Sequence, residues 1–324
     1  MPEASLGNRL GSKHVTSRHE ALPMNRSAAS LILLAFLSWP ALAQNQPAEN
    51  PARSLPAAAR LSQDQIRALI RVVADKDIEN DKKQNDYTYI QREEEHKLDA
   101  DGKVKSSESR TSEIMVLYGE QVRRLIAKDD KPLSEKDAAK EEEKIRKLTD
   151  KRKNENEEQR KKRLETEEKD REDARNFVGE VADAYDFRLI GTENLDGRET
   201  YVIDAEPRPD FRPHLKDAKI LPKFRFRAWI DQAESQWVKL DAECIDTVSV
   251  GWFLARIHKG SRLLIDQTRV NDEVWLPRHV AVKVDVRVAL LKNFNLEADV
   301  TYRDYKKFRT DTKIVPVGEL QEQH

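Results

Sequence analysis

The side chains with the greatest potential for chemistry are scattered along this sequence. Its seven histidines include no pair at metal-binding spacing, and the chain has no HExxH, CxxC or GxSxG motif and no glycine-rich phosphate loop. His258, near Lys259 and Asp246, is a conceivable acid–base group, although a histidine in a surface loop is the more common situation. The sequence therefore predicts no catalytic constellation, no metal site and no cofactor, which argues against an enzyme.

Cys244 is the only cysteine, so stability must come from packing and not from an internal disulfide. It lies in an alternating apolar segment, which predicts a buried and inert thiol. The chain carries 58 Lys and Arg against 59 Asp and Glu, a formal net charge of -1. This balance provides no basic field and argues against nucleic acid as a partner.

Strands are the elements that must position any site. Between Phe224 and Tyr302 apolar and polar residues alternate with a period of two, as in half-buried antiparallel strands with one face in water. The simplest structure for them is one large, curved, antiparallel sheet. Its apolar face is predicted to hold Phe224, Phe226, Ile230, Val238, Leu240, Val282, Val284, Val286, Leu296 and Val300. That face is either a filled core or an open apolar cleft.

A helix is predicted to begin after Ser62, because Gln65 completes a capping box with it. An apolar stripe at helical spacing follows, formed by Ile66, Leu69, Ile70 and Val73. The stripe has two interpretations, a fixed helix that covers the sheet or a movable lid that contacts a ligand. Both place the helix on the apolar face.

Two strands are predicted over residues 87–98 and 104–117, joined by a turn at 99–102, and another over 122–127. The first of them is polar on both faces beyond Ile90. We expect it to be an edge strand, because charged side chains at an edge discourage pairing with another sheet.

Residues 134–175 consist mainly of Lys, Arg, Asp and Glu in nearly equal numbers. Pairs such as Glu143 with Lys147 have the favourable i,i+4 orientation, and Ser134 can cap a helix start. These features predict a long charged helix or a helical hairpin, mostly in water. The segment is either an arm that binds an envelope protein or a solvated insertion without a binding role.

The N-terminal region has the pattern of a secretory signal peptide. Arg26 supplies a positive charge, residues 28–37 are apolar, and residues 41–43 carry the small residues of a cleavage site. We expect cleavage after Ala43, with an uncleaved anchor as the alternative and Met24 as the natural start. Because the apolar run is too short to span a bilayer, the mature chain is expected to be periplasmic without a transmembrane span.

The organisation expected along the chain follows from these segments. Residues 1–43 are assigned to an upstream extension and the signal peptide, and 44–60 to a disordered linker rich in Pro and Ala. The folded domain covers 61–308, interrupted by the charged insertion at about 134–175. Residues 309–324 are expected to form a flexible tail.

Four short phrases in the C-terminal half resemble periplasmic proteins of the LolA/LolB-type superfamily, the outer-membrane lipoprotein sorting and carrier proteins. The phrases are residues 197–203 (GRETYVI), 228–231 (AWID), 272–277 (DEVWLP) and 302–305 (YRDY). The resemblance covers residues 186–308 and extends to 61–130. It implies an α+β fold with an unclosed antiparallel barrel wrapped around helices, and an apolar cavity for acyl chains. The charged insertion departs from the compact members.

Two functions follow as expectations. The first is a lipid- or lipoprotein-binding carrier that holds acyl chains on the apolar face, with lipid or acylated lipoprotein as partner. The second is a non-enzymatic envelope interaction or stress-sensor protein, with a filled core and a partner on the charged helix at 134–175. An exported hydrolase is a distant third.

Overall fold

The computed structural model describes residues 61–99, 101–250, 255–288 and 292–308. The signal peptide, the linker and the C-terminal tail predicted from the sequence lie outside the described residues. Within them the chain has an α+β fold built on a 13-stranded antiparallel sheet. The strand order is β4-β3-β2-β1-β13-β12-β11-β8-β7-β6-β5, and the sheet is not closed, because β4 and β5 stand at opposite ends of it.

The elements in chain order have the following bounds. They are α2 (Gln63–Gln84), β1 (Tyr87–Leu98), β2 (Val104–Leu117), β3 (Glu120–Lys128), β4 (Lys131–Pro132), α3 (Glu135–Lys153), α4 (Glu157–Ala184), β5 (Tyr185–Leu195), β6 (Arg198–Pro207), the 3-10 helix η2 (Asp217–Lys223), β7 (Phe224–Asp231), β8 (Trp237–Cys244), β9 (Val248–Val250), β10 (Ala255–Ile257), β11 (Arg262–Val270), β12 (Val274–Val288) and β13 (Lys292–Lys307).

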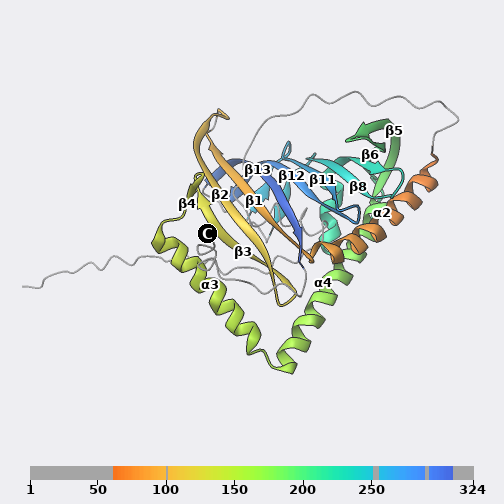
Figure 1. The fold of residues 1–324 in the computed structure, drawn as a ribbon. Helices are drawn as coiled ribbons and strands as arrows, with labels where there is room; N and C mark the ends of the chain where they lie inside the picture. The colour runs from red at the N-terminus through yellow and green to blue at the C-terminus, as the bar shows by residue number, and fades with distance from the viewer. Residues whose placement is uncertain (1–60, 100, 251–254, 289–291, 309–324) are drawn as a thin grey trace, which may run out of the picture.

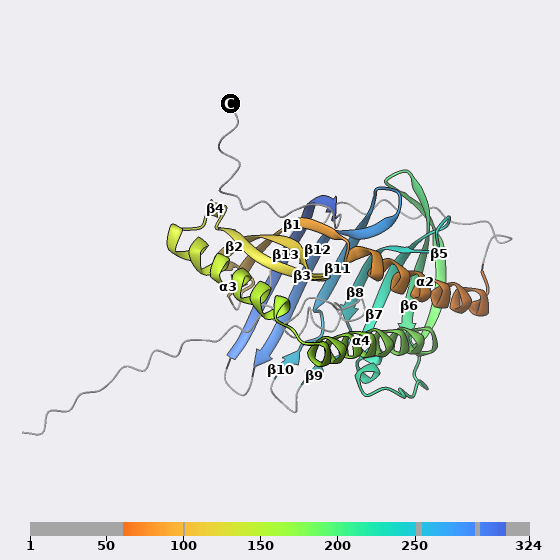
Figure 2. The same cartoon turned by 60° about the horizontal axis from the view of Figure 1, so that its bottom comes forward.

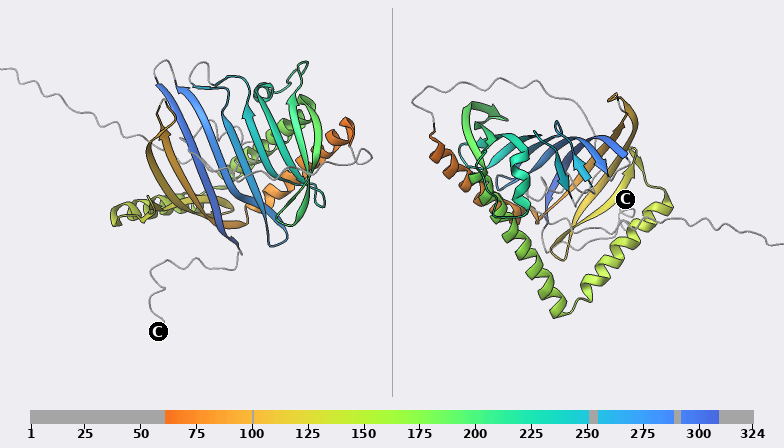
Figure 3. Two further views of the ribbon diagram at one scale, coloured as in Figure 1. Left: turned by 90° about the horizontal axis from the view of Figure 1, so that it is seen from above. Right: turned by 180° about the vertical axis from the view of Figure 1, so that it is seen from behind.

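The sheet arches over the helices α2, α3 and α4 (Figure 1). Seen from above, the strands form one continuous layer (Figure 3). The helix α2 and the C-terminal part of α4 lie beneath the β5–β8 end, and α3 lies beside β2 and β3 (Figure 2). We call the face of the sheet that points toward the helices the inner face, and the opposite one the outer face.

The helix α2 is fastened to the sheet at both of its ends. Ser62 and Gln65 form the predicted capping box. Near the start, the Gln63 side-chain amide exchanges two hydrogen bonds with the backbone of Phe187 in the end strand β5. Near its end, the Asn80 side chain does the same with the backbone of Trp275 in β12. Each side-chain amide pairs with a backbone N–H and a backbone C=O in the way that a neighbouring strand would.

A filled core lies between α2 and the β5–β7 end of the sheet. The stripe residues Ile66, Ile70 and Val73 pack there with Phe187 and Ile203. Asp77 adds a polar contact, since its carboxylate accepts a hydrogen bond from Trp237 Nε1 at 2.8 Å. Burial raises the pKa of Asp77 to about 6. Packing and hydrogen bonds together hold α2 against this end of the sheet.

The strand β1 is central, which corrects the expectation of an edge strand. It pairs with β13 on one side and β2 on the other along nearly its full length. Its buried side chains alternate as Tyr87, Tyr89, Gln91, Glu93 and Glu95. Hydropathy alone did not reveal this period, because three of the five buried residues are polar or charged.

The charged segment forms two helices joined at an angle, one of the predicted arrangements (Figure 1). The chain breaks between them at Asn154, and Asn156 caps the second helix in a capping box with Gln159. On the first helix, Glu141 accepts a hydrogen bond from the backbone N–H of Leu125 in β3 at 3.2 Å. The helix α3 thereby covers backbone groups of β3 next to the short end strand β4.

His279 on the outer face links three strands and makes stability depend on pH. Its Nε2 lies 2.6 Å from Asp299 on β13, and its Nδ1 lies 3.5 Å from Asp266 on β11. Hydrogen bonds to these two carboxylates raise the pKa of His279 to about 9, from 6.5. The folded-state pKa exceeds the unfolded value, so the stabilisation is fully present below pH 6.5 and is lost as the pH rises through 9.

We therefore expect His279→Gln to lower the free energy of unfolding by about 1–2 kcal/mol at pH 6, after allowance for partial solvent exposure. The difference from wild type should vanish at pH 10. Urea unfolding at the two pH values measures it. His214→Gln, at a side chain that is 91% exposed, is the control. An equal loss for His279→Gln at both pH values would contradict the charge-based explanation.

Candidate functional site

Most of the side chains predicted for the apolar face come together on the inner face. Those in one hydrophobic cluster, or packed against it, are Phe224, Phe226, Leu240, Val282, Val284, Val286, Leu296 and Val300. Ile230 lies on the same face but belongs to the neighbouring core under α2. Phe226 and Trp237 contact both clusters and join them.

Val238 is the exception, and the reason is a β-bulge. The pairing of β7 with β8 shifts between Trp229 and Ile230, so that Ile230 faces Trp237 and Val238 is the extra residue. Val238 packs instead with Trp229 and Trp275 in a separate cluster. A register shift of one residue moves a side chain to the other face of the sheet. The alternation of apolar and polar residues in the sequence does not reveal such a shift.

The four side chains predicted as a lid do not lie over the eight clustered residues. Ile66, Ile70 and Val73 are part of the core under α2, and Leu69 packs against that core. In this structure the stripe packs as a covering helix would, and the movable lid stays a prediction. The movable lid is not part of the site described below.

Strand register shows how the inner face is laid out. Residues directly opposite each other on neighbouring strands share a face, so successive pairs define rows across the sheet. The Glu95 row consists of Glu95, Ala298, Val282, Leu263, Ala242 and Phe226. The Glu93 row consists of Glu93, Val300, Val280, Ile265, Leu240 and Ala228. Each row begins with a carboxylate on β1 and is apolar from β13 to β7.

The helices reach the ends of this face more than its middle. In the described part of the chain, α2 packs on β5 and β12, α3 on β3, and α4 on α2 and η2. No described helix packs extensively on β8, β11 or β13. Phe226, Leu240, Val280 and Val286 are only partly buried within the cluster. Most of the other row residues are nevertheless buried, with Leu263, Ile265 and Ala298 at 0%, 4% and 7% exposed. The apolar rows are therefore open only in part, at Phe226, Leu240 and Val280.

A polar group borders the apolar rows at β1. Glu93 and Glu95 lie next to Arg110 of β2 and Arg123 of β3, with the nearest guanidinium nitrogens at 3.9 Å from Glu93 and 4.0 Å from Glu95. Burial raises the pKa of Glu93 to about 7; the two arginines lower it, and Glu95 raises it further. The β1 side of the site therefore holds two buried carboxylates. The two guanidinium groups beside them also interact with other residues.

Tyrosines complete the border. The ring of Tyr89 lies 5.9 Å from that of Tyr302 and 5.1 Å from that of Tyr305. Burial raises the pKa of Tyr89 to about 12 and that of Tyr302 further, so both hydroxyls stay neutral. The carboxylates of β1 therefore border the apolar side chains of β13 directly, and the tyrosines lie beside them, further along β1 and β13.

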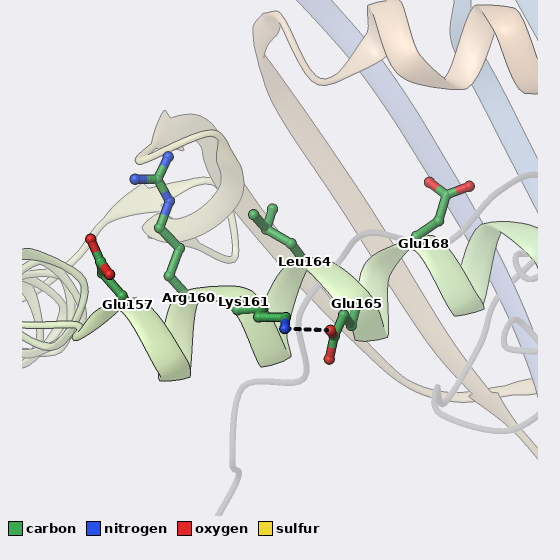
Figure 4. Close-up of a pocket in the computed structure, with 6 residues that line it drawn as sticks. All are labelled: Glu157, Arg160, Lys161, Leu164, Glu165 and Glu168. Carbon is green, nitrogen blue, oxygen red and sulfur yellow. Dashed lines mark ion pairs between the residues drawn. The ribbon is translucent and has the colours of Figure 1, made fainter.

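Other features of the described residues offer no alternative site. A depression on α4, lined by Glu157, Arg160, Lys161, Leu164, Glu165 and Glu168, belongs to one helix alone, with an ion pair of 3.9 Å between Lys161 and Glu165 (Figure 4). In the part of the chain that the structure describes, no cluster of His, Cys, Asp or Glu is arranged to hold a metal. None of the described helices is both long and apolar enough to span a bilayer.

The carboxylates of β1 were missed by the sequence reading. The available signal was a strand of 12 residues without Gly or Pro, in which Gln91, Glu93 and Glu95 continue the period that Tyr87 and Tyr89 begin. Cys244, in contrast, is buried as expected, and burial raises the pKa of its thiol to about 11. Such a thiol is a poor nucleophile.

No protein-family model matches this chain, and no curated protein matches it. Among solved structures it is similar to a DUF1329 family protein from Desulfovibrio piger, with 11% identity, a TM-score of 0.30 and coverage of 76% of this chain and 95% of that one. A putative outer membrane lipoprotein-sorting protein domain from Vibrio parahaemolyticus has 12% identity, a TM-score of 0.29 and coverage of 74% and 95%. A LolA superfamily protein from Nitrosomonas europaea has 10% identity, a TM-score of 0.26 and coverage of 75% and 93%. The last two belong to the group that the sequence resembles, but likeness at this level assigns no function.

Proposed function

We propose that this chain is a periplasmic carrier that holds the acyl chain of a lipid or lipoprotein on the inner face of its sheet. One observation carries the proposal: two adjacent apolar rows cross β13, β12, β11, β8 and β7 without interruption. No described helix packs extensively on β8, β11 or β13. The export part of the proposal rests on the signal-peptide pattern of the N-terminal residues.

The dimensions of the rows suit one acyl chain. From β1 to β7 a row spans five interstrand gaps, or about 24 Å at about 4.8 Å each. The hydrocarbon of one bilayer leaflet is about 15 Å thick, half of the whole. Because each buried methylene contributes about 0.8 kcal/mol, the apolar rows alone can hold a chain without a cofactor or nucleotide.

Partial exposure within the rows also favours a binding surface. Leu240 and Val280 lie on either side of Ile265 in the Glu93 row, and both keep part of their surface accessible. The core under α2 contrasts with this, since Ile66, Phe187 and Ile203 are at most 1% exposed. Leu263 and Ile265 of the rows are buried in the same way, at 0% and 4% exposed. The accessible part of the rows, at Leu240 and Val280, is where the proposed acyl chain would make contact.

Native mass spectrometry of the mature protein tests the proposal directly. The protein is purified from a bacterial periplasm without detergent, and bound molecules are extracted and identified. We expect a stoichiometric lipid or acylated peptide. A mass that stays bare after incubation with phospholipid and acylated peptide would contradict the proposal.

The alternative is an envelope interaction protein that binds its partner through α3 and α4. It has its own observation, because α3 has no fully buried residue and Leu164 of α4 is 47% exposed. The contact of Glu141 with β3 gives α3 a structural role that needs no partner. A bare mass in the experiment above would favour the interaction protein.

A further inference from the structure

We propose that Glu93 and Glu95 form a subsite for the primary ammonium group of a lipid headgroup, placed at the polar end of the apolar rows. This inference rests on the proposed function, because the acyl chain of the same lipid would lie along those rows. The subsite extends the binding face from an apolar surface to one that selects its ligand by headgroup.

The placement of the two carboxylates is the first step. Glu93 is opposite Val300, and Glu95 is opposite Ala298, in the antiparallel pairing of β1 with β13. Directly opposite side chains have Cβ atoms about 5 Å apart on one face. A ligand whose chain lies along either row therefore meets a carboxylate at the β1 end.

The hydrogen bonds of Glu95 are the second step. Its side chain is only 4% exposed, yet neither carboxylate oxygen has a hydrogen-bond partner. A buried acceptor without a donor is costly, and a buried charge more so. A ligand with N–H donors would supply the hydrogen bonds to Glu95 that the described residues do not make.

The neighbouring cations have hydrogen-bond acceptors other than Glu95. Arg110 donates to Glu108 at 2.9 Å, and its distance to Glu95 is 4.0 Å. Arg123 donates to Gln91 at 3.1 Å and lies 3.9 Å from Glu93. The two guanidinium groups therefore offset the charge of the carboxylates but donate no hydrogen bond to Glu95.

Lys97 shows that an ammonium group can reach this place. Its Nζ lies 3.3 Å from Glu95 Oε1 as an ion pair without hydrogen-bond geometry, and its side chain is 51% exposed. A half-exposed lysine can move away into water, because its stem is flexible. The ammonium of a bound headgroup would then take its position with better-aligned donors.

The test compares three lysophospholipids with the same acyl chain and different headgroups. Ethanolamine carries three N–H donors and a charge, choline carries the charge without N–H donors, and glycerol carries neither. We expect binding of lysophosphatidylethanolamine to be about tenfold tighter than that of the glycerol lipid, with choline between them. Competition in native mass spectrometry gives the ratios.

Glu93→Gln with Glu95→Gln should remove the preference for ethanolamine while keeping affinity for the acyl chain. Glu95→Gln alone is the milder change and should remove most of the preference for ethanolamine. It replaces the double variant in the test if the double variant does not fold. The matched control is Glu94→Gln, because Glu94 lies between them on the other face of β1, paired with Arg92. It should keep the wild-type preference.

The outcomes separate the two proposals. Equal binding of the three lipids by the wild-type protein, or a preference unchanged in both Glu95 variants, would overturn the ammonium subsite and leave the carrier intact. Binding of none of the three lipids would overturn both. A preference lost in the Glu95 variants and kept in Glu94→Gln would support both.

Discussion

Replacing Ala298 by Phe is expected to weaken acyl-chain binding at least tenfold, with the free energy of unfolding within about 1 kcal/mol of wild type. Ala298 is in the Glu95 row, between Glu95 and Val282, and is the smallest side chain at the β1 end of the apolar surface. Ala298 is 7% exposed, so a phenyl ring there would project onto the inner face where the proposed ligand lies. Isothermal titration with a lysophospholipid and urea unfolding measure the two effects.

The same substitution distinguishes a binding surface from a filled core. In a filled core, the added ring would overpack the interior and lower stability by about 1–3 kcal/mol. The matched control is Ala281→Phe, which makes the same change on β12, next to Val282 but on the outer face. We expect it to leave binding unchanged. A large loss of stability in Ala298→Phe, with no change in lipid binding, would contradict the carrier.

The sheet was predictable wherever burial follows hydropathy. The alternation that begins at Phe224 agrees with β7 of the structure, because Phe224, Phe226, Ala228 and Ile230 are apolar on one face. The capping box at Ser62 was likewise readable, since its two side chains are close in the sequence. Local rules of this kind depend only on neighbouring residues.

What the sequence hid depends on long-range pairing. The central position of β1 requires β13, which lies about 200 residues further along the chain in sequence, to pair with it. Once paired, Glu93 and Glu95 are buried because strand partners exclude water, and arginines from β2 and β3 offset their charge. A period of two among polar residues has no hydropathy signal, so these residues were interpreted as solvent-facing.

The sequence therefore predicted the apolar cluster on the inner face but gave no sign of the carboxylates beside it. The place where α2 packs was hidden for a related reason: an apolar stripe shows that a helix packs, but not against which part of a sheet. The docking of α2 is decided by Gln63 and Asn80, whose partners are backbone groups of β5 and β12. Backbone partners leave no trace in the sequence.

Asn80→Ala is expected to lower the free energy of unfolding by about 2–3 kcal/mol. The Asn80 amide donates to Trp275 O at 2.6 Å and accepts from Trp275 N at 2.7 Å, and the residue is 6% exposed. Alanine would leave the Trp275 N–H without the side-chain acceptor, at about 1–3 kcal/mol. Trp275 O would keep only the longer hydrogen bond from Gln84 Nε2, at 3.4 Å. The higher helix propensity of alanine offsets only about half a kcal/mol. Urea unfolding measures the loss, and Glu79→Ala, at an exposed position of α2, is the control.

This substitution also decides whether α2 covers the fold or opens as a lid. A covering helix shares the core of Ile66 and Phe187, so weakening its attachment must lower the stability of the whole domain. A lid would detach with little global cost, and Asn80→Ala would instead speed the entry and exit of ligand. We expect the first result, with unfolding cooperative and the lipid dissociation rate unchanged under native conditions. A faster lipid dissociation rate with an unchanged free energy of unfolding would support the lid interpretation instead.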